Sequence, residues 1–259
     1  MNVVTLPDKR TVTLHPDVTV VTGGNGCGKT AFLDAAILHL RKERTDDAVF
    51  RAASKRDDYA PSATEHAWLR KILAPHDPPA SGAGARRLVE LFVATADAAR
   101  HVLRRPQDGV VRGTLFADDV EKDLDPTWQQ RVVPALRKAF PTLRLVLTTR
   151  SAVVLSTVRA EHVRVLFPGR DAEPPSLQTV AVEPDTLLAS IFGLDPRPDL
   201  PEARAASALR SLIGQGLHGS PEAAALQADL VSVYGSRHPV VLDVERLARF
   251  QAFKLKAAP

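Results

Sequence analysis

The sequence has a single cysteine, Cys27, among its 259 residues, so no disulfide bond can form within the chain. This composition suits a reducing compartment. No stretch approaches the roughly 18 consecutive apolar residues that a membrane-spanning helix needs. The N-terminal residues MNVVTLPDKR lack the apolar core of a secretion signal. We therefore expect a cytoplasmic protein without a membrane partner.

Histidines, which commonly bind catalytic metals, form no cluster in the sequence. The eight histidines are scattered, and no two of them have the H-x-x-x-H spacing that places two ligands on one face of a helix. The sequence therefore shows no metal-dependent nuclease centre of its own. Its net charge of +4 and pI near 9.4 are compatible with a nucleic-acid partner without requiring one.

The first two thirds of the chain alternate β-branched runs with amphipathic segments, which is typical of a mostly parallel α/β sheet. We expect strands at 18–21, 110–119, 143–151 and 161–167, and helices at 29–43, 86–104 and 128–140. Pro134 is expected to kink or restart the last of these helices. Residues 44–65 indicate an exposed connection and 169–176 a loop, and helical segments are expected from residue 185 onward.

Residues 22–30 read TGGNGCGKT, between a β-branched run and an amphipathic run. They match the P-loop pattern, in which backbone N–H groups surround phosphate oxygens at a helix N-terminus. Lys29 is expected to reach the β- and γ-phosphates of ATP, and Thr30 to bind Mg²⁺. The other expected phosphate contacts are Gly23, Gly24, Asn25, Gly26, Cys27 and Gly28. Two alternatives stay open: a chance glycine-rich turn, and a redox-sensitive role for Cys27 instead of simple space filling.

An apolar run, Leu115-Phe116-Ala117, ends in Asp118 and Asp119. With the residues up to Asp125 it resembles the Walker B strand and D-loop of ABC-type ATPases, in which D-E-x-x-x-x-L-D follows the apolar run. The resemblance implies that Asp118 binds Mg²⁺ and that Asp119 replaces the glutamate that polarises the attacking water. Asp125 takes the last D-loop position. The alternative is a solvated strand end.

The segment LRLVLTTRS resembles the next core strand of that family, which usually ends T-T-H-S. Arg150 therefore stands where a catalytic switch histidine is expected. An arginine there can contact the γ-phosphate as a fixed positive charge, but it cannot accept a hydrogen bond as neutral histidine can. The alternative is an ordinary surface arginine.

The family also has a signature segment, L-S-G-G-Q, which caps the γ-phosphate bound by a partner subunit. The segment ASGAGARRLVEL resembles it at Ser81 and Gly82, and Arg87 falls where the family often has arginine. The alternative is a Ser/Gly loop that caps a helix. No glutamine occurs between Thr30 and Arg104, so the Q-loop glutamine is missing. The interval before Ser81 is also too short for the full helical subdomain of the family.

Residues 118–156 resemble the OLD-like and SMC/RecF-like AAA family ATPases of prokaryotic phage-defence loci, including retron and Septu systems. The matching residues are Pro126, Trp128, Gln129, Phe140 and Pro141. Residues 182–216 are similar to the helical extension of the same ATPases. The resemblance implies an ABC/SMC-like core over 1–170, with a reduced helical region at about 44–105, and a mainly helical extension over 171–259.

The resemblance also implies ATP-driven assembly into a homodimer or higher homo-oligomer, and control of a separate, nuclease-like effector. Two functions stay open at this point. The chain is either an ATP-hydrolysing subunit of a phage-defence or DNA-processing complex, or a degenerate regulator that binds ATP and hydrolyses little. Asp119, Arg150 and the missing glutamine favour the second. A DNA-repair ATPase is a further alternative, and a transporter subunit is disfavoured because the parts that couple to a membrane partner are missing.

Overall fold

The computed structural model describes residues 2–42, 48–52, 62–103 and 113–257. The chain forms two compact units, Met1–Leu194 and Asp195–Pro259. The division therefore lies at residue 194, not at the expected residue 170. Two elements between these positions belong to the first unit. The strand β8 (Arg170–Glu173) pairs with β7 (Val163–Phe167), and the helix α7 (Pro184–Phe192) contacts α6 (Ala152–Leu155).

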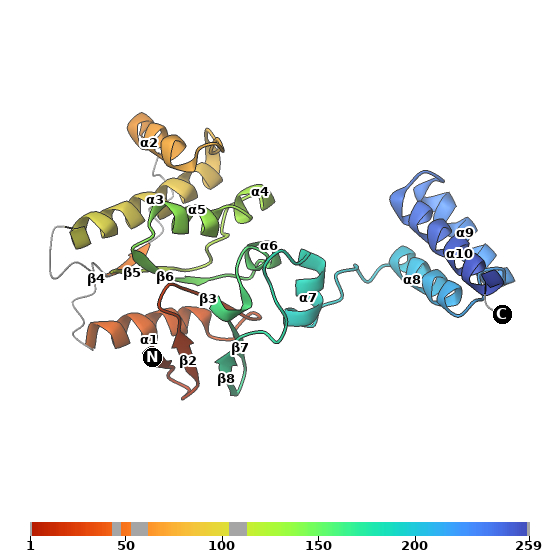
Figure 1. Cartoon of the computed structure of the whole chain (residues 1–259), viewed down its shortest axis with the longest axis horizontal. Coiled ribbons are helices and arrows are strands. Elements are labelled where there is room, and N and C mark those ends of the chain that lie inside the picture. Colours follow the sequence, from red (N-terminus) through yellow and green to blue (C-terminus); the bar gives the residue numbers. More distant parts are fainter. Residues whose placement is uncertain (1, 43–47, 53–61, 104–112, 258–259) are drawn as a thin grey trace. The chain divides into compact units, whose positions relative to one another are not determined.

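The first unit contains a six-stranded sheet with the order β4-β5-β6-β3-β7-β8 (Figure 1). All neighbours in it are parallel except β7 and β8, which confirms the expected mostly parallel α/β fold. The strands are β3 (Val18–Thr22), β4 (Ala48–Ala52), β5 (Gly113–Ala117), β6 (Leu143–Thr148), β7 (Val163–Phe167) and β8 (Arg170–Glu173). A separate antiparallel hairpin joins β1 (Asn2–Thr5) and β2 (Thr11–Leu14).

The central strands are apolar on both faces because helices or the hairpin cover each face. In β5, Leu115 and Ala117 belong to one buried cluster, whereas Phe116 between them belongs to the other. In β6, Val146 likewise faces away from its two leucine neighbours. This alternation follows from the two-residue repeat of side chains along a strand.

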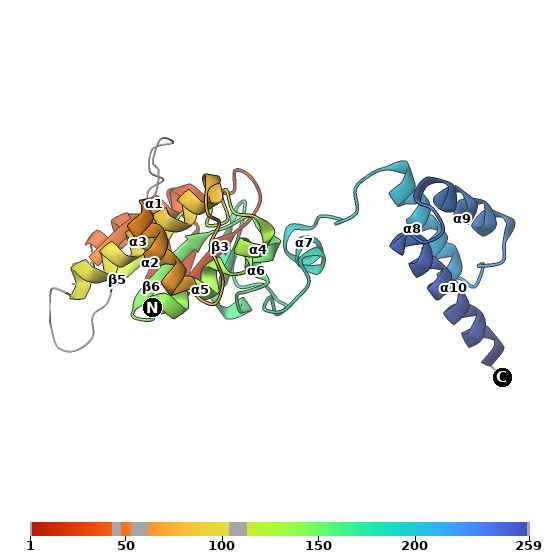
Figure 2. The same cartoon turned by 90° about the horizontal axis from the view of Figure 1, so that it is seen from above.

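Figures 1 and 2 show α1 (Lys29–Lys42) and the hairpin on one face of the sheet, with most other helices of this unit on the opposite face. Buried side chains of α1 and the hairpin form the smaller cluster with Phe116 and Val146. The other helices of the unit are α2 (Ala63–Leu73), α3 (Gly82–Leu103), α4 (Pro126–Gln129), α5 (Val132–Ala139), α6 (Ala152–Leu155) and α7 (Pro184–Phe192).

Two expectations about local structure need correction, and a third agrees with the structure. Residues 48–52, expected within an exposed connection, form β4, because pairing with β5 supplies the ladder that the local sequence does not signal; residues 43–47 and 53–61 lie outside the described part. The expected loop at 169–176 contains β8, which pairs with β7. The helix expected at 128–140 is split into α4 and α5, which agrees with the restart expected at Pro134: this proline lies in the first turn of α5, where a missing N–H costs no helical bond.

The second unit is helical, as the sequence indicates, and contains α8 (Pro201–Gly214), α9 (Pro221–Tyr234) and α10 (Pro239–Ala257). A proline begins each helix, where its fixed φ suits the first turn. Its small core holds Ala206, Leu209, Ile213, Ala223, Leu230, Val241 and Val244. Across the described residues of both units, no helix is long and apolar enough to cross a membrane.

Candidate phosphate-binding site

The turn between β3 and α1 has the backbone that the glycine pattern predicts. Gly23 has φ +146°, and a Cβ there would lie 2.5 Å from the carbonyl oxygen of Leu166 on the neighbouring strand β7. Gly28 has φ +99°, and a Cβ would lie 3.0 Å from the guanidinium of Arg10. Gly23 is therefore required by space as well as by conformation, whereas at Gly28 the positive φ is the main reason for glycine.

Lys29 begins α1 and is buried, with its ammonium turned back against the turn. Nζ donates to the carbonyl oxygens of Gly23 at 2.8 Å and Gly24 at 3.0 Å. The remaining contact is with Sγ of Cys27 at 3.8 Å, and sulfur is a weak acceptor. A phosphate oxygen would be the better partner for this third N–H, since bonds between charged groups are stronger.

Thr30 and Asp118 meet at the ends of α1 and β5, as the sequence predicts for a shared magnesium ion. Oγ1 of Thr30 donates to Oδ2 of Asp118 at 3.0 Å. The other carboxylate oxygen accepts a hydrogen bond from Oγ1 of Thr148, at the end of β6. Mg²⁺ in nucleotide sites uses one or two protein oxygens together with phosphate and water oxygens. A hydroxyl and a carboxylate that already touch fit this requirement.

Asp119 adopts φ +42°, a left-handed conformation that Asp tolerates better than most residues. Its N–H donates to Oγ1 of Thr148 at 2.8 Å. Its Oδ2 accepts from Nη2 of Arg150 at 3.1 Å, whereas Oδ1 is buried and has no hydrogen-bond partner among the described residues. Nη1 of Arg150 donates to Oδ1 of Asn25 in the phosphate-binding turn at 3.2 Å. Arg150 therefore joins three of the predicted site segments.

Arg87 links the signature-like helix α3 to the acidic strand end. Its Nη2 donates to the carbonyl oxygens of Asp118 at 2.7 Å and Asp119 at 3.2 Å, and its guanidinium lies 3.9 Å from Glu90. Burial lowers the pKa of Arg87, and the negative charge of Glu90 opposes this shift. An arginine stays charged nevertheless. It therefore holds the backbone of both aspartates in place.

Ser81, Gly82 and Asp125 are exposed. Gly82 begins α3 with φ +90°, and Asp125 caps α4 by accepting a hydrogen bond from the N–H of Trp128 at 3.0 Å. Among the hydrogen bonds between described residues, none joins these three to the phosphate-binding turn of the same chain. The structure thus brings together the predicted residues of the turn with Asp118, Asp119 and Arg150, and leaves the signature-like residues apart.

Sequence reasoning missed several residues that position the site. Arg10, in the β1–β2 turn, is buried and donates to the carbonyl oxygens of Cys27 at 2.9 Å and Phe167 at 2.7 Å. A hydrogen bond with Asp8 raises the pKa of Arg10. The others are Thr148, Glu121 and Gln129. Their contacts join strand ends and turns that are far apart in the sequence. Gln129 and Thr148 lie in segments that resemble the ATPases, but the resemblance assigned them no role in the site.

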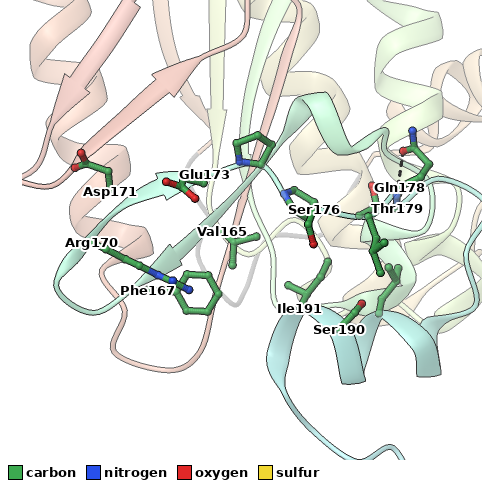
Figure 3. A pocket seen from close by; sticks show the side chains of 14 residues that line it. Val165, Phe167, Arg170, Asp171, Glu173, Ser176, Gln178, Thr179, Ser190 and Ile191 are labelled. Atoms are coloured by element: carbon green, nitrogen blue, oxygen red, sulfur yellow. Dashed lines mark hydrogen bonds between the residues drawn. The ribbon is translucent and has the colours of Figure 1, made fainter.

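The pocket in Figure 3 is a different feature of the first unit. It has a volume of about 260 Å³ and lies between the β7–β8 hairpin and α7. The guanidinium of Arg170 stacks over the ring of Phe167 at 3.9 Å on its wall, and Val165 and Ile191 add apolar surface. None of the predicted site residues lines it.

No protein-family profile matches the chain. Two curated relatives are similar in sequence. The retron Ec83 probable ATPase of Escherichia coli is 26% identical over 143 residues, which are 54% of this chain and 26% of that protein. The retron Vc95 probable ATPase of Vibrio cholerae serotype O1 biovar El Tor is 34% identical over 64 residues, 25% of this chain and 12% of that protein. The chain therefore matches only a minor part of each relative's length.

Among solved structures, the SMC head domain from Thermotoga maritima has a TM-score of 0.46 and 12% identity, covering 68% of this chain and 97% of that domain. An inward-facing, putative metal-chelate type ABC transporter has a TM-score of 0.44 and 16% identity, covering 75% and 90%. The fold of this chain is described by its own strand order and its phosphate-binding turn, and not by these similarities. The chain thus has a mostly parallel α/β fold with a P-loop-like turn, and by sequence it is similar to the probable ATPases of retrons.

Proposed function

We propose that this chain binds ATP with Mg²⁺ and hydrolyses it slowly, as a subunit of a prokaryotic defence or DNA-processing complex. The contact that carries this proposal joins Oγ1 of Thr30 to Oδ2 of Asp118 at 3.0 Å, directly beside the lysine of the phosphate-binding turn. It pairs the two oxygens that a nucleotide-bound Mg²⁺ would need. The similarity to retron probable ATPases supports both the nucleotide and the defence setting.

In this proposal two chains assemble around ATP, and Ser81, Gly82 and Asp125 of one chain face the phosphates held by the other. Their exposure, and their lack of hydrogen bonds to the turn of their own chain, support this arrangement. A higher homo-oligomer would use the same contacts. The assembled ATPase controls a separate effector with nuclease-like chemistry, and nucleic acid is a further candidate partner.

The alternative is a regulator that binds ATP with little hydrolysis. One observation favours it: Arg150 is paired with Asp119, the carboxylate expected to polarise water. The carboxylate oxygen that accepts from the guanidinium is already occupied and is less available to a water molecule. Aspartate is also shorter than glutamate by one methylene, and misplacement of a catalytic group by about 1 Å can lower a rate about 100-fold.

Calorimetry and turnover assays test the two functions. We expect ATP binding that depends on Mg²⁺, with turnover below about 1 per second, the low end of typical enzymes. The Asp119→Asn variant should still bind ATP but lose the remaining turnover. Unchanged turnover in Asp119→Asn would show that another group activates the water, and turnover of tens per second in the wild type would exclude the regulator.

Light scattering of Asp119→Asn with ATP and Mg²⁺ tests the assembly. We expect an increase in mass over the nucleotide-free protein, and Ser81→Arg in the same background should prevent it by filling the proposed contact. Asp77→Arg, an exposed charge change in the loop before α3, is the control. Equal ATP-dependent masses for Ser81→Arg and its control would contradict the proposed interface.

A further inference from the structure

The three residues that follow β6 are attached to the turn that follows β5. Thr149, Arg150 and Ser151 each make a hydrogen bond to a side chain from residues 121–129. Parallel neighbouring strands end at the same edge of the sheet, so the segments after β5 and β6 lie side by side. The backbone itself adds one bond, from the N–H of Val120 to the carbonyl oxygen of Thr148 at 2.9 Å.

Glu121 uses both carboxylate oxygens for this attachment. Oε1 accepts from the backbone N–H of Arg150 at 2.8 Å, and Oε2 accepts from Oγ1 of Thr149 at 2.7 Å. The main chain of Arg150 is therefore held by a side chain of the D-loop-like turn, at the point where β6 has ended. Bonds to a charged acceptor are stronger than neutral ones.

Gln129 provides the second attachment. Its Oε1 accepts from Oγ of Ser151 at 2.6 Å, and its Nε2 donates to the carbonyl oxygen of Leu124 at 2.8 Å. Leu124 directly precedes the exposed Asp125. One amide side chain thus connects the residue after Arg150 with the turn that the proposed interface would touch.

We propose that Glu121 and Gln129 are positioning residues that fix the main chain of Arg150 and couple it to the exposed turn at Leu124–Asp125. The proposal rests on the function proposed above for Asp119 and Arg150. The guanidinium of Arg150 is about half exposed, with 53% of the side chain accessible, so its own two contacts hold it weakly. With its main chain anchored, a shift of the Leu124–Asp125 turn moves Arg150 relative to Asp119.

Hydrogen exchange, ATP affinity and turnover of three variants test this coupling. Glu121→Ala removes both acceptors. Glu121→Gln keeps one acceptor, and its amide can donate to the Thr149 hydroxyl, so it should preserve the attachment. Gln129→Ala removes the second attachment alone. Glu173→Ala, an exposed carboxylate on β8, is the control.

For Glu121→Ala we expect exchange of the amides of 149–151 to rise about tenfold, because the bond protecting the Arg150 N–H is lost. We expect turnover to fall about 10- to 100-fold. The ATP Kd should stay within about twofold, because the substitution changes neither the phosphate-binding turn nor Asp118. Gln129→Ala should give a smaller effect in the same direction. Glu121→Gln should stay within about threefold of the wild type in all three measurements.

Exchange at 149–151 no faster in Glu121→Ala than in Glu173→Ala would overturn the proposal. So would an equal loss of turnover in Glu121→Gln and Glu121→Ala, or a loss of ATP affinity that matches the loss of turnover. A wild type that does not bind ATP would refute the proposed function instead. In that case the exchange of the 149–151 amides still decides whether Glu121 anchors Arg150.

Discussion

The guanidinium of Arg150 lies 3.1 Å from the carboxylate of Asp119, so the arginine that we propose as the switch residue pairs with the carboxylate that we propose to activate water. The same guanidinium reaches Asn25 in the phosphate-binding turn. A nucleotide that draws Arg150 toward its γ-phosphate would release Asp119. This pair is therefore where nucleotide binding and water activation meet in the proposed mechanism.

Substitutions of Asp119 should show how much the positive φ at this position costs in stability. Asn tolerates a positive φ, so we expect Asp119→Asn to unfold at the same denaturant concentration as the wild type. Asp119→Glu restores the longer reach but places a less tolerant residue at φ +42°, at a cost of about 1 kcal/mol. Urea unfolding measures this cost. Equal stability of the Glu and Asn variants would contradict the strain at this position.

Lys29→Ala should weaken ATP binding about 10- to 100-fold, because a hydrogen bond to a charged group contributes about 1.5–3 kcal/mol. Isothermal calorimetry with ATP and Mg²⁺ measures the change. Lys42→Ala, at the exposed end of the same helix, is the matched control. If both variants bind as the wild type does, Lys29 does not contact the phosphates.

Thr148→Val should raise the Mg²⁺ concentration needed for ATP binding about tenfold, since it removes the hydroxyl that holds both Asp118 and the N–H of Asp119. Thr114→Val is the control, because its hydroxyl is buried in β5 and has no hydrogen-bond partner among the described residues. A Mg²⁺ titration of nucleotide binding compares the two. A similar effect of both variants would indicate a general change in the sheet.

The stability of the first unit should fall in mild acid because of His15. Its ring packs edge-on against His162 at 4.1 Å between centroids, and burial followed by the charge of His162 lowers the pKa of His15. Asp17 and Glu161 oppose the shift, and Arg164 adds to it. As the pH falls below 6.5, His15 therefore binds a proton more readily in the unfolded chain than in the folded one. The free energy of unfolding is therefore highest above that pH and decreases below it.

Thermal unfolding at about pH 7.5 and about pH 5.5 tests this effect. The decrease in Tm between the two pH values should be smaller for His15→Gln than for the wild type. His76→Gln, at an exposed histidine, should leave the decrease unchanged. An identical decrease in all three proteins would assign the acid sensitivity to other groups.

The sequence by itself determined the α/β class and the parallel core strands. It also predicted the phosphate-binding turn between β3 and α1. These features are local: Gly23 and Gly28 need unusual backbone angles, Lys29 begins a helix, and apolar runs mark buried strands. The resemblance to ABC-type ATPases also implied that the turn, Asp118 and Arg150 would share one site, and the structure places them at the ends of the neighbouring parallel strands β3, β5 and β6.

Only the tertiary structure decided the contacts between segments that are distant in the sequence. Arg10 holds the turn from a hairpin, Thr148 holds both aspartates, and Glu121 and Gln129 hold the segment around Arg150. The edge strands β4 and β8 likewise depend on pairing with a neighbour, because their own sequences are short and polar or mixed. Hydrogen bonds of this kind depend on register and turn geometry, which local residue patterns do not encode.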